Sequence, residues 1–516
     1  MHRQAFSHFT SSDSISIRDF SMASCFKLVQ NPEKGRILVA DRDIPTSQLI
    51  LEEPPCALGP QVDVDKLVCL SCFIEIDGRF QCSLCSIPMC SKECASDSIH
   101  QTLECQVFGK MGLILENYKP LMRCVFTLRL ISTLRTTRDP NLKMLINDLM
   151  DHNSIRKLDV SSWDHFQKSV TNFILDNLGL TKFTSREEIN RLIGIMRTNG
   201  IQTKSRNGHT QLVLLYPQMA ILSHSCICNA RCVKKLSTFN HIEIYAQQHI
   251  PKGEEITIQY TSLMNSTRSR RQNIKQSWCF DCHCPRCCDP SELGSELGTL
   301  HCPECNDTEG YLRLIHPLAY DSDYGCHKCQ SMMSQKTVIE LENDLESSLN
   351  KLIHLRGQKY VEALLHQAEL TKRSNHFHPN HYLQMRLQSE LISHLGNIPG
   401  YFYFELSDEM VRLKRDLCLH FIEVFSKVDP GFSDWRGTTQ YELANTEATL
   451  AQRSFDSGTI PLKEFQTKLE AIITLNQEAV SVLEVEDEES HAFEIGLRAR
   501  KNVRDLKDIV RFSEFL

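Results

Sequence analysis

The 516-residue sequence contains no run of about 18 consecutive apolar residues, the length that a membrane-spanning helix requires. Its first 20 residues are polar and rich in serine, and they lack the apolar segment of a secretory signal peptide. These two absences predict a protein that is neither secreted nor membrane-spanning and that has no membrane partner. We expect it to reside in the nucleus, the cytoplasm or both.

A large excess of charge of one sign is also missing. The chain has 57 Lys and Arg residues against 64 Asp and Glu residues, for a formal net charge of −7 at pH 7. Basic runs longer than Arg268-Ser269-Arg270-Arg271 are absent, and we interpret this short cluster as a solvated helix face. Both features argue against nucleic acid as the main partner, because phosphate binding requires denser Lys and Arg patches.

Cysteine, by contrast, is abundant, with 23 residues. In a reducing compartment, cysteines in C-x2-C pairs indicate metal ligands rather than disulfides. The densest group offers eight ligands, enough for two tetrahedral zinc ions. Its members are Cys69, Cys72, Cys82, Cys85, Cys90, Cys94, His100 and Cys105. Spacing alone leaves open which of these pairs share an ion.

A later group has the spacing of a zinc ribbon, with two C-x2-C pairs separated by 20 residues. Its members are Cys302, Cys305, Cys326 and Cys329. Four thiolates around one ion leave no open coordination position for a substrate. We therefore predict a structural site.

Cys282, Cys284 and Cys287 offer three thiolates and need a fourth ligand. Cys226 is one candidate for the fourth ligand if the fold brings it close, and the alternative is that Cys279, Cys288 or another neighbour completes the site locally.

The eight cysteines outside the zinc groups are interpreted as small core residues. They are Cys25, Cys56, Cys124, Cys228, Cys232, Cys279, Cys288 and Cys418.

The apolar pattern predicts strands at 26–29, 35–40, 212–216, 241–245 and 255–258. The spacing is helical over 106–195, for example at Leu121, Val125, Leu128 and Ile131, and again beyond about 335. We interpret the acidic stretch 484–489 as a solvated helix end. The sequence thus predicts an α+β protein whose β-fold is interrupted by a zinc module and a helical insert and is followed by a helical lobe.

Six short stretches, in the family's order, resemble the SET-and-MYND-domain (SMYD) family of protein-lysine methyltransferases. They are Lys34-Gly35-Arg36-Ile37, Thr198-Asn199-Gly200-Ile201, Leu215-Tyr216-Pro217, Ser223-His224-Ser225-Cys226-Ile227-Cys228-Asn229-Ala230, Gly253-Glu254-Glu255-Ile256-Thr257-Ile258-Gln259-Tyr260 and Trp278-Cys279-Phe280-Asp281-Cys282-His283-Cys284. Residues 69–105 resemble a MYND finger, although His100 and Cys105 are one residue further apart than is usual. The extra four-cysteine group resembles the arthropod SmydA-like branch.

The resemblance implies a division of the chain into eight parts. These are a disordered N-terminus (1–22), the N-terminal part of the SET fold (23–68), a MYND zinc finger (69–105), a helical insert (106–195), the core of the SET fold (196–262), a post-SET zinc segment (263–290), a four-cysteine ribbon (300–330) and a helical lobe (335–516) similar to tetratricopeptide-like lobes.

The resemblance also implies the pairing of the zinc ligands. Cys69, Cys72, Cys90 and Cys94 would hold one MYND ion, Cys82, Cys85, His100 and Cys105 the other, and Cys226 would complete the post-SET site. Two ions in the MYND finger, one at the post-SET site and one in the ribbon give four zinc ions in total.

The same resemblance implies S-adenosylmethionine as cofactor and Tyr260 as the catalytic residue, its hydroxyl orienting the substrate amine. The residues implied in cofactor binding are Gly35, Arg36, Asn199, Ser223, His224 and Phe280, with the Phe280 ring against the adenine. Asn229 is expected either to tie loops together or to form a local Asx turn.

The sequence departs from the family pattern at three positions. Ile37 replaces the second glycine of a Gly-x-Gly turn, where a side chain narrows the approach of the backbone to a cofactor. Ser223 replaces an asparagine and offers a shorter hydroxyl in place of an amide. Cys228 replaces a proline, which alters the stiffness of the loop.

We therefore expect a protein-lysine methyltransferase that acts on histone or non-histone lysines, with a role in transcription regulation. The alternative is a catalytically weak or inactive adaptor that binds co-regulator peptides, and Ile37 and Ser223 favour it. In either case the resemblance implies that the MYND finger binds proline-containing peptides, with histone deacetylases among the partners.

Overall fold

The computed structural model describes residues 25–98, 100–105, 118–205, 208–235, 240–305 and 309–513. The segment 1–22, expected to be disordered, lies outside the described residues. The described chain forms two compact units. The first holds residues 25–27 and 53–221, and the second holds residues 28–52 and 222–513. The expected combination of strands, helices, Cys/His groups and a C-terminal helical lobe is confirmed.

The first unit contains a three-stranded antiparallel sheet. Its order is β4 (Ala57–Pro60), β6 (Gln211–Leu215) and β5 (Ile201–Lys204). Helix α3 (Lys119–Thr136) packs on β4 beside Gly59, where a Cβ atom would lie 2.7 Å from the backbone nitrogen of Phe126. Glycine thus lets helix and strand approach at backbone distance.

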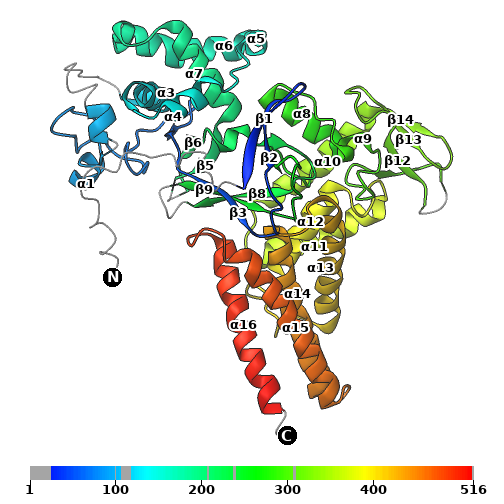
Figure 1. Ribbon diagram of the computed structural model, residues 1–516. Helices are drawn as coiled ribbons and strands as arrows, with labels where there is room; N and C mark the ends of the chain where they lie inside the picture. The colour runs from blue at the N-terminus through cyan, green and yellow to red at the C-terminus, as the bar shows by residue number, and fades with distance from the viewer. Residues whose placement is uncertain are drawn as a thin grey trace. The chain divides into compact units, whose positions relative to one another are not determined.

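Helices make up most of the rest of this unit (Figure 1). Helix α3 buries Leu121, Val125 and Ile131, three of the positions whose spacing predicted it. The other elements are α1 (Lys92–Ala95), η1 (His100–Glu104), α4 (Pro140–Asn147), α5 (Asn153–Arg156), α6 (Val160–Phe166), η2 (Gln167–Thr171), η3 (Phe173–Asn177), η4 (Leu180–Lys182), α7 (Arg186–Asn199) and η5 (Met219–Ile221). Helix α7 begins where the Ser185 side chain accepts a hydrogen bond from the backbone N–H of Glu188.

The second unit contains several small sheets. Strands β1 (Phe26–Asn31) and β2 (Gly35–Ala40) form one, β3 (Leu49–Glu53), β9 (His241–Ala246) and β8 (Ala230–Lys235) form another, and β7 (Ser223–His224) pairs in parallel with β10 (Thr257–Ile258). In β9 the side chains of Ile242, Ile244 and Ala246 are buried and those between them are half-buried, which is the period of a strand with one core face.

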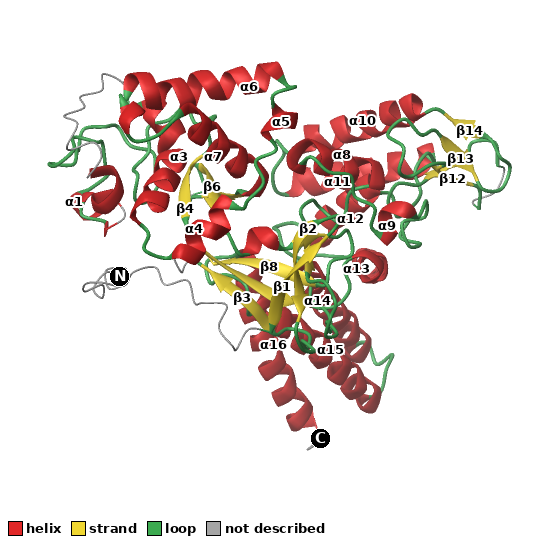
Figure 2. Cartoon of the chain, turned by 45° about the horizontal axis from the view of Figure 1, so that its top comes forward, coloured by secondary structure: helices red, strands yellow, loops and turns green. Residues whose placement is uncertain are grey.

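Two helices and a further sheet follow these strands. They comprise α8 (Thr267–Trp278), α9 (Pro285–Cys288) and the ribbon strands β11 (Leu300–His301), β12 (Tyr311–Leu314), β13 (Tyr324–Cys326) and β14 (Met332–Met333). The ribbon strands pair in chain order (Figure 2). The interpretation of residues 268–271 as a solvated helix face is wrong, because Arg270 and Arg271 are 0% and 3% exposed. Their guanidinium groups bind buried carboxylate and carbonyl oxygens, which compensates their desolvation.

Seven helices form the C-terminal lobe. They are α10 (Gln335–Leu352), α11 (Gln358–Ser374), α12 (Tyr382–His394), α13 (Asp408–Val428), α14 (Asp434–Asp456), α15 (Leu462–Leu483) and α16 (His491–Ser513). Helices α13 to α16 lie side by side in chain order (Figure 1). One apolar core joins the ribbon to this lobe, since Leu312 and Tyr324 of the ribbon pack in the same cluster as Val338 and Leu364.

Two further interpretations need correction. The acidic stretch 484–489 is only partly solvated: Glu488 and Glu489 are exposed, but Glu486 pairs with Arg231 and Asp487 is 3% exposed. Cys288 is exposed rather than a core residue, and its thiol donates a hydrogen bond to the carbonyl oxygen of His283. Cys25, Cys124, Cys228 and Cys418 are buried as expected.

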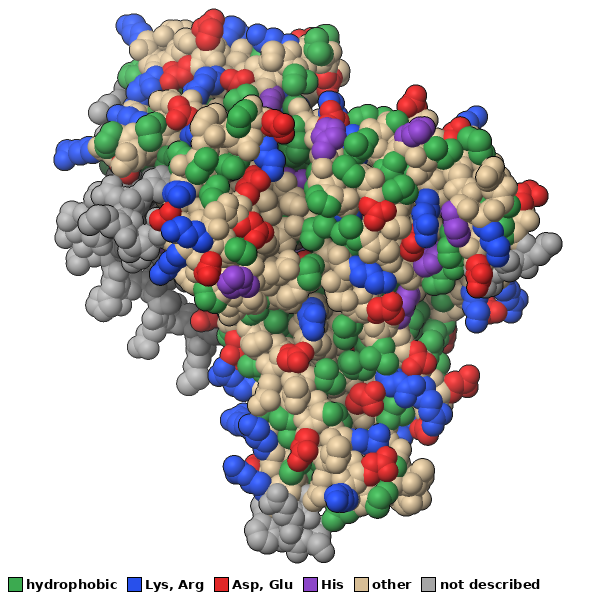
Figure 3. All heavy atoms as spheres, turned by 45° about the vertical axis from the view of Figure 1, so that its right-hand side comes forward, with side chains coloured by type: hydrophobic (Ala, Val, Ile, Leu, Met, Phe, Trp, Pro, Cys, Tyr) green, Lys and Arg blue, Asp and Glu red, His purple; other side chains and the backbone are tan. Residues whose placement is uncertain are grey.

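Acidic and basic side chains are interspersed on the face in Figure 3, and the described residues form no continuous basic field there. Among the described helices, none has the length and apolar character needed to cross a membrane.

Candidate active site and metal centres

The eight ligand residues of the MYND-like segment separate into two groups in the first unit. One group consists of Cys69, Cys72, Cys90 and Cys94, and the other of Cys82, Cys85, His100 and Cys105. Within each group the ligand atoms all lie within 4.8 Å of one another. This is the interleaved arrangement that the family resemblance implied.

His100 is oriented by a carboxylate behind it. Its Nε2 atom lies 3.1 Å from the sulfur of Cys105, while its Nδ1 atom lies 3.4 Å from a carboxylate oxygen of Glu104. Glu104 in turn accepts a 2.6 Å hydrogen bond from the Nε of Arg129, whose side chain is also buried. A carboxylate on the far nitrogen fixes the tautomer that presents Nε2 to a metal. Glu104 lies inside the spacing between His100 and Cys105 and Arg129 lies outside the motif, but neither was assigned a role, so this support was not predicted.

The second unit holds the two other groups. The sulfurs of Cys226, Cys282, Cys284 and Cys287 lie within 4.8 Å of one another, and so do those of Cys302, Cys305, Cys326 and Cys329. Of the alternatives that the sequence left open for the first of these groups, the structure brings Cys226 to the three post-SET cysteines. The fourth sulfur therefore comes from a loop about 56 residues earlier in the chain, at the end of β7.

The distances within these groups suit zinc. Tetrahedral zinc with Zn–S bonds of about 2.3 Å places its sulfurs about 3.8 Å apart. The sulfur pairs Cys72–Cys90, Cys226–Cys287 and Cys302–Cys329 are 3.6, 3.6 and 3.5 Å apart. Soft thiolate donors at this spacing can hold zinc, and all of these cysteines are free thiols.

A buried ion network surrounds the Cys226 group. The Nε of Arg270 donates to the sulfur of Cys226 across 3.1 Å, and one of its terminal nitrogens lies 2.6 Å from Glu292. Arg286 lies 2.9 Å from the same carboxylate oxygen. Although burial alone would raise the pKa of Glu292, the two guanidinium groups lower it below its usual value. The positive charges balance a carboxylate and a group of thiolates that water does not reach.

Tyr260, the predicted catalytic residue, follows β10 and is held at three places. Its hydroxyl donates a 2.5 Å hydrogen bond to the carbonyl oxygen of Leu222, and its backbone N–H donates to Nδ1 of His224 across 3.0 Å. Its ring lies 5.1 Å from the ring of Trp278, measured between centroids. Burial raises the pKa of the phenol well above its usual value, so the hydroxyl is protonated at neutral pH.

Aromatic rings make up the surroundings of Tyr260. The rings of His224 and Phe280 lie 5.3 and 6.4 Å from that of Tyr260, with Phe280 edge-on. The sequence analysis placed His224 and Phe280 at this site but assigned no role to Trp278. Trp278 is the first residue of the same motif as Phe280, and this position was the available signal that Trp278 belongs to the site.

The remaining predicted cofactor residues lie in both units. Gly35 has a φ of 78°, in the left-handed region that favours glycine, and Arg36 follows it on β2. Ile37 is 6% exposed and continues this strand. Ser223 is held in β7 by pairing with Thr257 of β10. Asn199 belongs to the first unit, where its side-chain amide donates to the carbonyl oxygens of Met150 and Ile195.

Asn229 ties distant loops together and forms no local turn with its side chain. Its amide nitrogen donates to the carbonyl oxygen of Glu255 and to the carboxylate of Glu254, both at 2.9 Å. Its side-chain oxygen accepts the backbone N–H of Thr257 at 2.8 Å. This network holds the segment that leads into Tyr260.

Comparison with known proteins agrees with this geometry. The SET domain family model matches residues 35–261. The chain is 25% identical over 332 residues to SET domain-containing protein SmydA-8, isoform A, of Drosophila melanogaster, which covers 62% of this chain and 68% of that protein. This chain contains a SET domain and is similar to proteins of the SMYD family. The family resemblance that the sequence motifs suggested is therefore confirmed.

Other relatives extend the comparison. It is 26% identical over 266 residues to N-lysine methyltransferase SMYD2 of Homo sapiens, covering 50% of this chain and 59% of that protein. It is also 26% identical over 356 residues to histone-lysine N-methyltransferase ASHR1 of Arabidopsis thaliana, covering 65% and 70%. A solved SET-domain structure of LSMT with lysine and AdoHcy aligns at 12% identity over 96% of this chain and 87% of that one, with a TM-score of 0.29, too low to support an argument.

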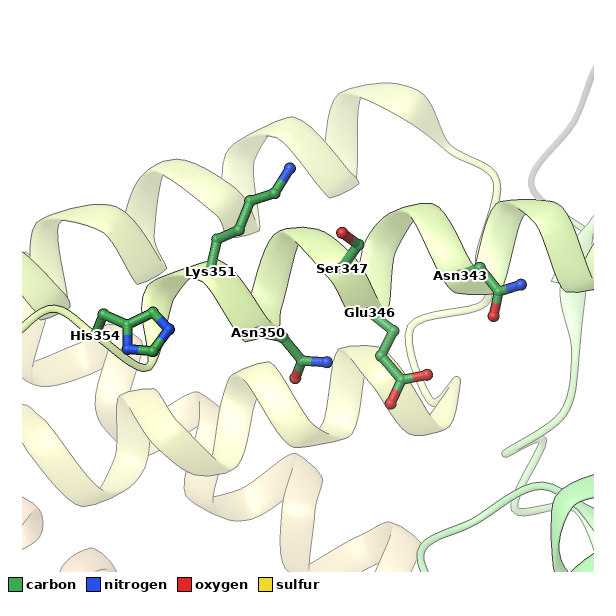
Figure 4. Close-up of a pocket in the computed structure, with 6 residues that line it drawn as sticks. All are labelled: Asn343, Glu346, Ser347, Asn350, Lys351 and His354. Carbon is green, nitrogen blue, oxygen red and sulfur yellow. The ribbon is translucent and has the colours of Figure 1, made fainter.

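Two hollows of about 480 and 460 Å³ lie in the helical lobe. The larger follows α10 and the turn after it, and the residues that line it are of polar types (Figure 4). The smaller has an apolar floor of Leu349, Leu364 and Leu387 between α10, α11 and α12. Neither hollow includes a residue of the predicted cofactor site.

Proposed function

We propose that this protein is an S-adenosylmethionine-dependent protein-lysine N-methyltransferase whose substrate is a lysine side chain of a histone or another protein. The observation that carries the proposal is the arrangement around Tyr260, whose hydroxyl, backbone N–H and ring are each held by a different partner. The names of the human and Arabidopsis relatives agree with this reaction.

When bound, S-adenosylmethionine supplies a methyl group on a positively charged sulfur. Transfer to an amine is an in-line displacement, so the protein must hold a neutral lysine nitrogen on the axis of the reacting bond. A lysine side chain has a pKa of about 10.4 in water, and burial lowers it because the ammonium form loses its hydration. The rings of Tyr260, Trp278 and Phe280 offer such an apolar environment.

Tyr260 orients the amine through its hydroxyl. The phenol stays protonated, and its proton is donated to the carbonyl oxygen of Leu222. The lone pairs of the phenol oxygen are then available to accept a hydrogen bond from the amine. A fixed acceptor restricts the direction of the nitrogen lone pair, which is the orientation that the displacement needs.

The cofactor would be held by backbone and aromatic groups. By resemblance, the Phe280 ring contacts the adenine, and the backbone near Gly35, Arg36 and Ser223, together with His224, binds the remainder. The regular strand conformation of Ile37 in β2 supports this role. The exchange of an amide for the Ser223 hydroxyl costs about 1 kcal/mol of binding free energy.

The four ligand groups would hold four zinc ions, two in the MYND-like segment, one at Cys226 and one in the ribbon. By family resemblance, the MYND-like segment binds proline-containing peptides of co-regulators, with histone deacetylases among the partners, and the protein acts in transcription regulation in the nucleus or the cytoplasm. A purely non-catalytic adaptor is not favoured, because Tyr260 and Phe280 are retained and lie together.

Transfer of a labelled methyl group tests this function. Zinc-loaded protein is incubated with methyl-labelled S-adenosylmethionine and either histone octamers or an array of lysine-containing peptides. We expect transfer by the wild type, a loss on the order of 100-fold in Tyr260→Phe, and full activity in the control Tyr401→Phe, which alters a tyrosine of the helical lobe. Equal transfer by wild type and Tyr260→Phe would contradict the proposal, and so would no transfer to either probe.

A further inference from the structure

The ribbon contacts the segment that carries Phe280. The loop between β12 and β13 folds back on itself, with backbone N–H groups of Ile315 and His316 donating to the carbonyl oxygen of Asp323 and the hydroxyl of Ser322. This loop, residues 315–323, is called the ribbon hairpin below. It presents Tyr320 toward residues 279–284, the segment that contains two of the post-SET cysteines.

Arg271 joins the two segments through one guanidinium group. Its Nε donates to the carbonyl oxygen of Cys282 at 3.2 Å, and a terminal nitrogen donates to the carbonyl oxygens of Pro317 and Leu318 at 3.2 and 2.7 Å. The guanidinium carbon also lies 4.7 Å from the centre of the Tyr320 ring. The Arg271 side chain is only 3% exposed, so the loss of a partner for its guanidinium group is costly.

Asp281 provides the second connection. One of its carboxylate oxygens accepts a hydrogen bond from the Tyr320 hydroxyl at 2.5 Å, and the other accepts from Nζ of Lys275 at 2.6 Å. Asp281 lies between Phe280, whose ring is near Tyr260 and His224, and Cys282, a member of the Cys226 group. The ribbon hairpin thus binds residues 279–284 at Asp281, which lies between the aromatic residue Phe280 and the candidate metal ligand Cys282.

We propose that the ribbon hairpin is a positioning element for residues 279–284, and that Tyr320 and Arg271 set the affinity for S-adenosylmethionine by fixing the Phe280 ring. This inference rests on the proposed function and adds a role for the ribbon, whose four thiols otherwise form a structural clip. Tyr320 and Arg271 are positioning residues, because they act through Asp281 and Cys282. The ribbon hairpin is itself anchored, since β12 and β13 carry Leu312 and Tyr324 into the core of the helical lobe.

The test compares the full-length wild type with three variants and one matched control. Tyr320→Phe removes only the hydroxyl that reaches Asp281. Arg271→Lys keeps the charge but lacks the planar guanidinium that donates to both segments through separate nitrogens, and Arg271→Met removes the charge. The control is Tyr311→Phe, the same change on the same ribbon at a ring that packs on His378. For each protein, the measurements are zinc content, the Kd for S-adenosylhomocysteine, and hydrogen exchange of residues 279–284 without cofactor.

We expect Tyr320→Phe to raise the Kd about fivefold, as loss of one hydrogen bond would, and Arg271→Met to raise it more than Arg271→Lys. The KM for S-adenosylmethionine should rise with the Kd while kcat at saturating cofactor stays near that of the wild type, and Tyr311→Phe should match the wild type. In the Tyr320 and Arg271 variants, hydrogen exchange of residues 279–284 should be faster than in the wild type, and the zinc content should be unchanged. Wild-type Kd and wild-type exchange in both Tyr320→Phe and Arg271→Lys would overturn the inference.

Failure of the proposed function would give a different pattern. If the wild type does not bind S-adenosylhomocysteine, the methyltransferase proposal fails. The exchange measurement then decides the positioning role by itself: faster exchange of 279–284 in Tyr320→Phe supports it, and unchanged exchange refutes it.

Discussion

The Nδ1 atom of His224 accepts a hydrogen bond from the backbone N–H of Tyr260 across 3.0 Å. A ring nitrogen that accepts carries no proton, so the proton of the neutral ring is on Nε2, which lies 3.2 Å from the sulfur of Cys226. One imidazole therefore connects the predicted catalytic residue to the post-SET group of thiols. The zinc-binding segment and the position of Tyr260 are mechanically coupled through this ring.

This coupling predicts the effect of His224→Ala. The change leaves the backbone N–H of Tyr260 without its acceptor, and a small displacement of a reacting group lowers the rate steeply. We expect kcat for methyl transfer to fall about 10- to 100-fold, with four zinc ions retained per chain. The matched control is His283→Ala, which removes an exposed histidine from the same post-SET segment. Unchanged kcat in His224→Ala would contradict the coupling.

Glu104→Gln tests the support of the MYND-like metal group. Loss of the carboxylate behind His100 weakens the orientation of its ring and leaves Arg129 without its buried partner. Such changes behind a metal ligand lower metal affinity about 10- to 100-fold. Competition with a coloured zinc chelator should therefore release one of the four ions earlier than in the wild type. Simultaneous release of all ions at the wild-type chelator concentration would exclude this role.

Glu292→Gln tests the ion network around Cys226. The carboxylate binds both Arg270 and Arg286, and it also accepts the backbone N–H of Thr267. Removing its charge leaves two buried guanidinium groups poorly balanced, which costs about 3 kcal/mol of the free energy of unfolding. Urea denaturation measures this loss, with Glu464→Gln on the surface of α15 as control. A loss below about 1 kcal/mol would mean that the thiolates alone balance the two arginines.

The buried carboxylate of Glu53 is expected to make the free energy of unfolding depend on pH. Its carboxylate is 1% exposed, and burial raises its pKa from 4.5 to about 7, although the backbone N–H groups of Gln218 and Met219 donate to it. Because the folded pKa exceeds the unfolded value, this contribution is fully present below pH 4.5 and is lost as the pH rises through about 7.

The comparison of wild type with Glu53→Gln isolates that contribution. The difference in unfolding free energy between the two proteins should shift by about 3 kcal/mol, against the wild type, as the pH rises from 4.5 to 8. Denaturation at several pH values measures it. Glu52→Gln, which removes an exposed carboxylate from the same strand, is the control. A pH-independent difference for Glu53→Gln would show that the side chain keeps one protonation state throughout.

Much of the site was predictable because metal ligands and short motifs carry their information in local spacing. The C-x2-C pairs indicated the zinc groups, and the motif around Ser223 and His224 indicated the loop that supplies Cys226. Long-range partners were not predictable in this way. Arg270 and Arg271 have the local pattern of a solvated helix face, yet Glu292 and the carbonyl oxygens of Pro317 and Leu318 hold them in the interior.

The contacts of Glu486 and Trp278 were also missed because they depend on long-range partners rather than on local spacing. Acidic residues after a helix usually face solvent, and only the return of β8 with Arg231 makes Glu486 a buried partner. Trp278 lies within a recognised motif, but its contact with Tyr260 depends on how α8 ends, where Cys279 adopts a φ of 62°. Tertiary pairing and backbone direction at a helix end decide these contacts, and neither is a property of local spacing.

Calorimetric titration of S-adenosylmethionine into the zinc-loaded wild type, Phe280→Ala and the control Phe404→Ala tests whether the cofactor binds at Phe280. Phe404 is 81% exposed in the helical lobe, so its removal leaves the predicted site intact. The account predicts micromolar binding by the wild type and by Phe404→Ala, and loss of binding in Phe280→Ala. Absence of binding to the intact, zinc-loaded wild type, or equal binding by Phe280→Ala, would contradict it.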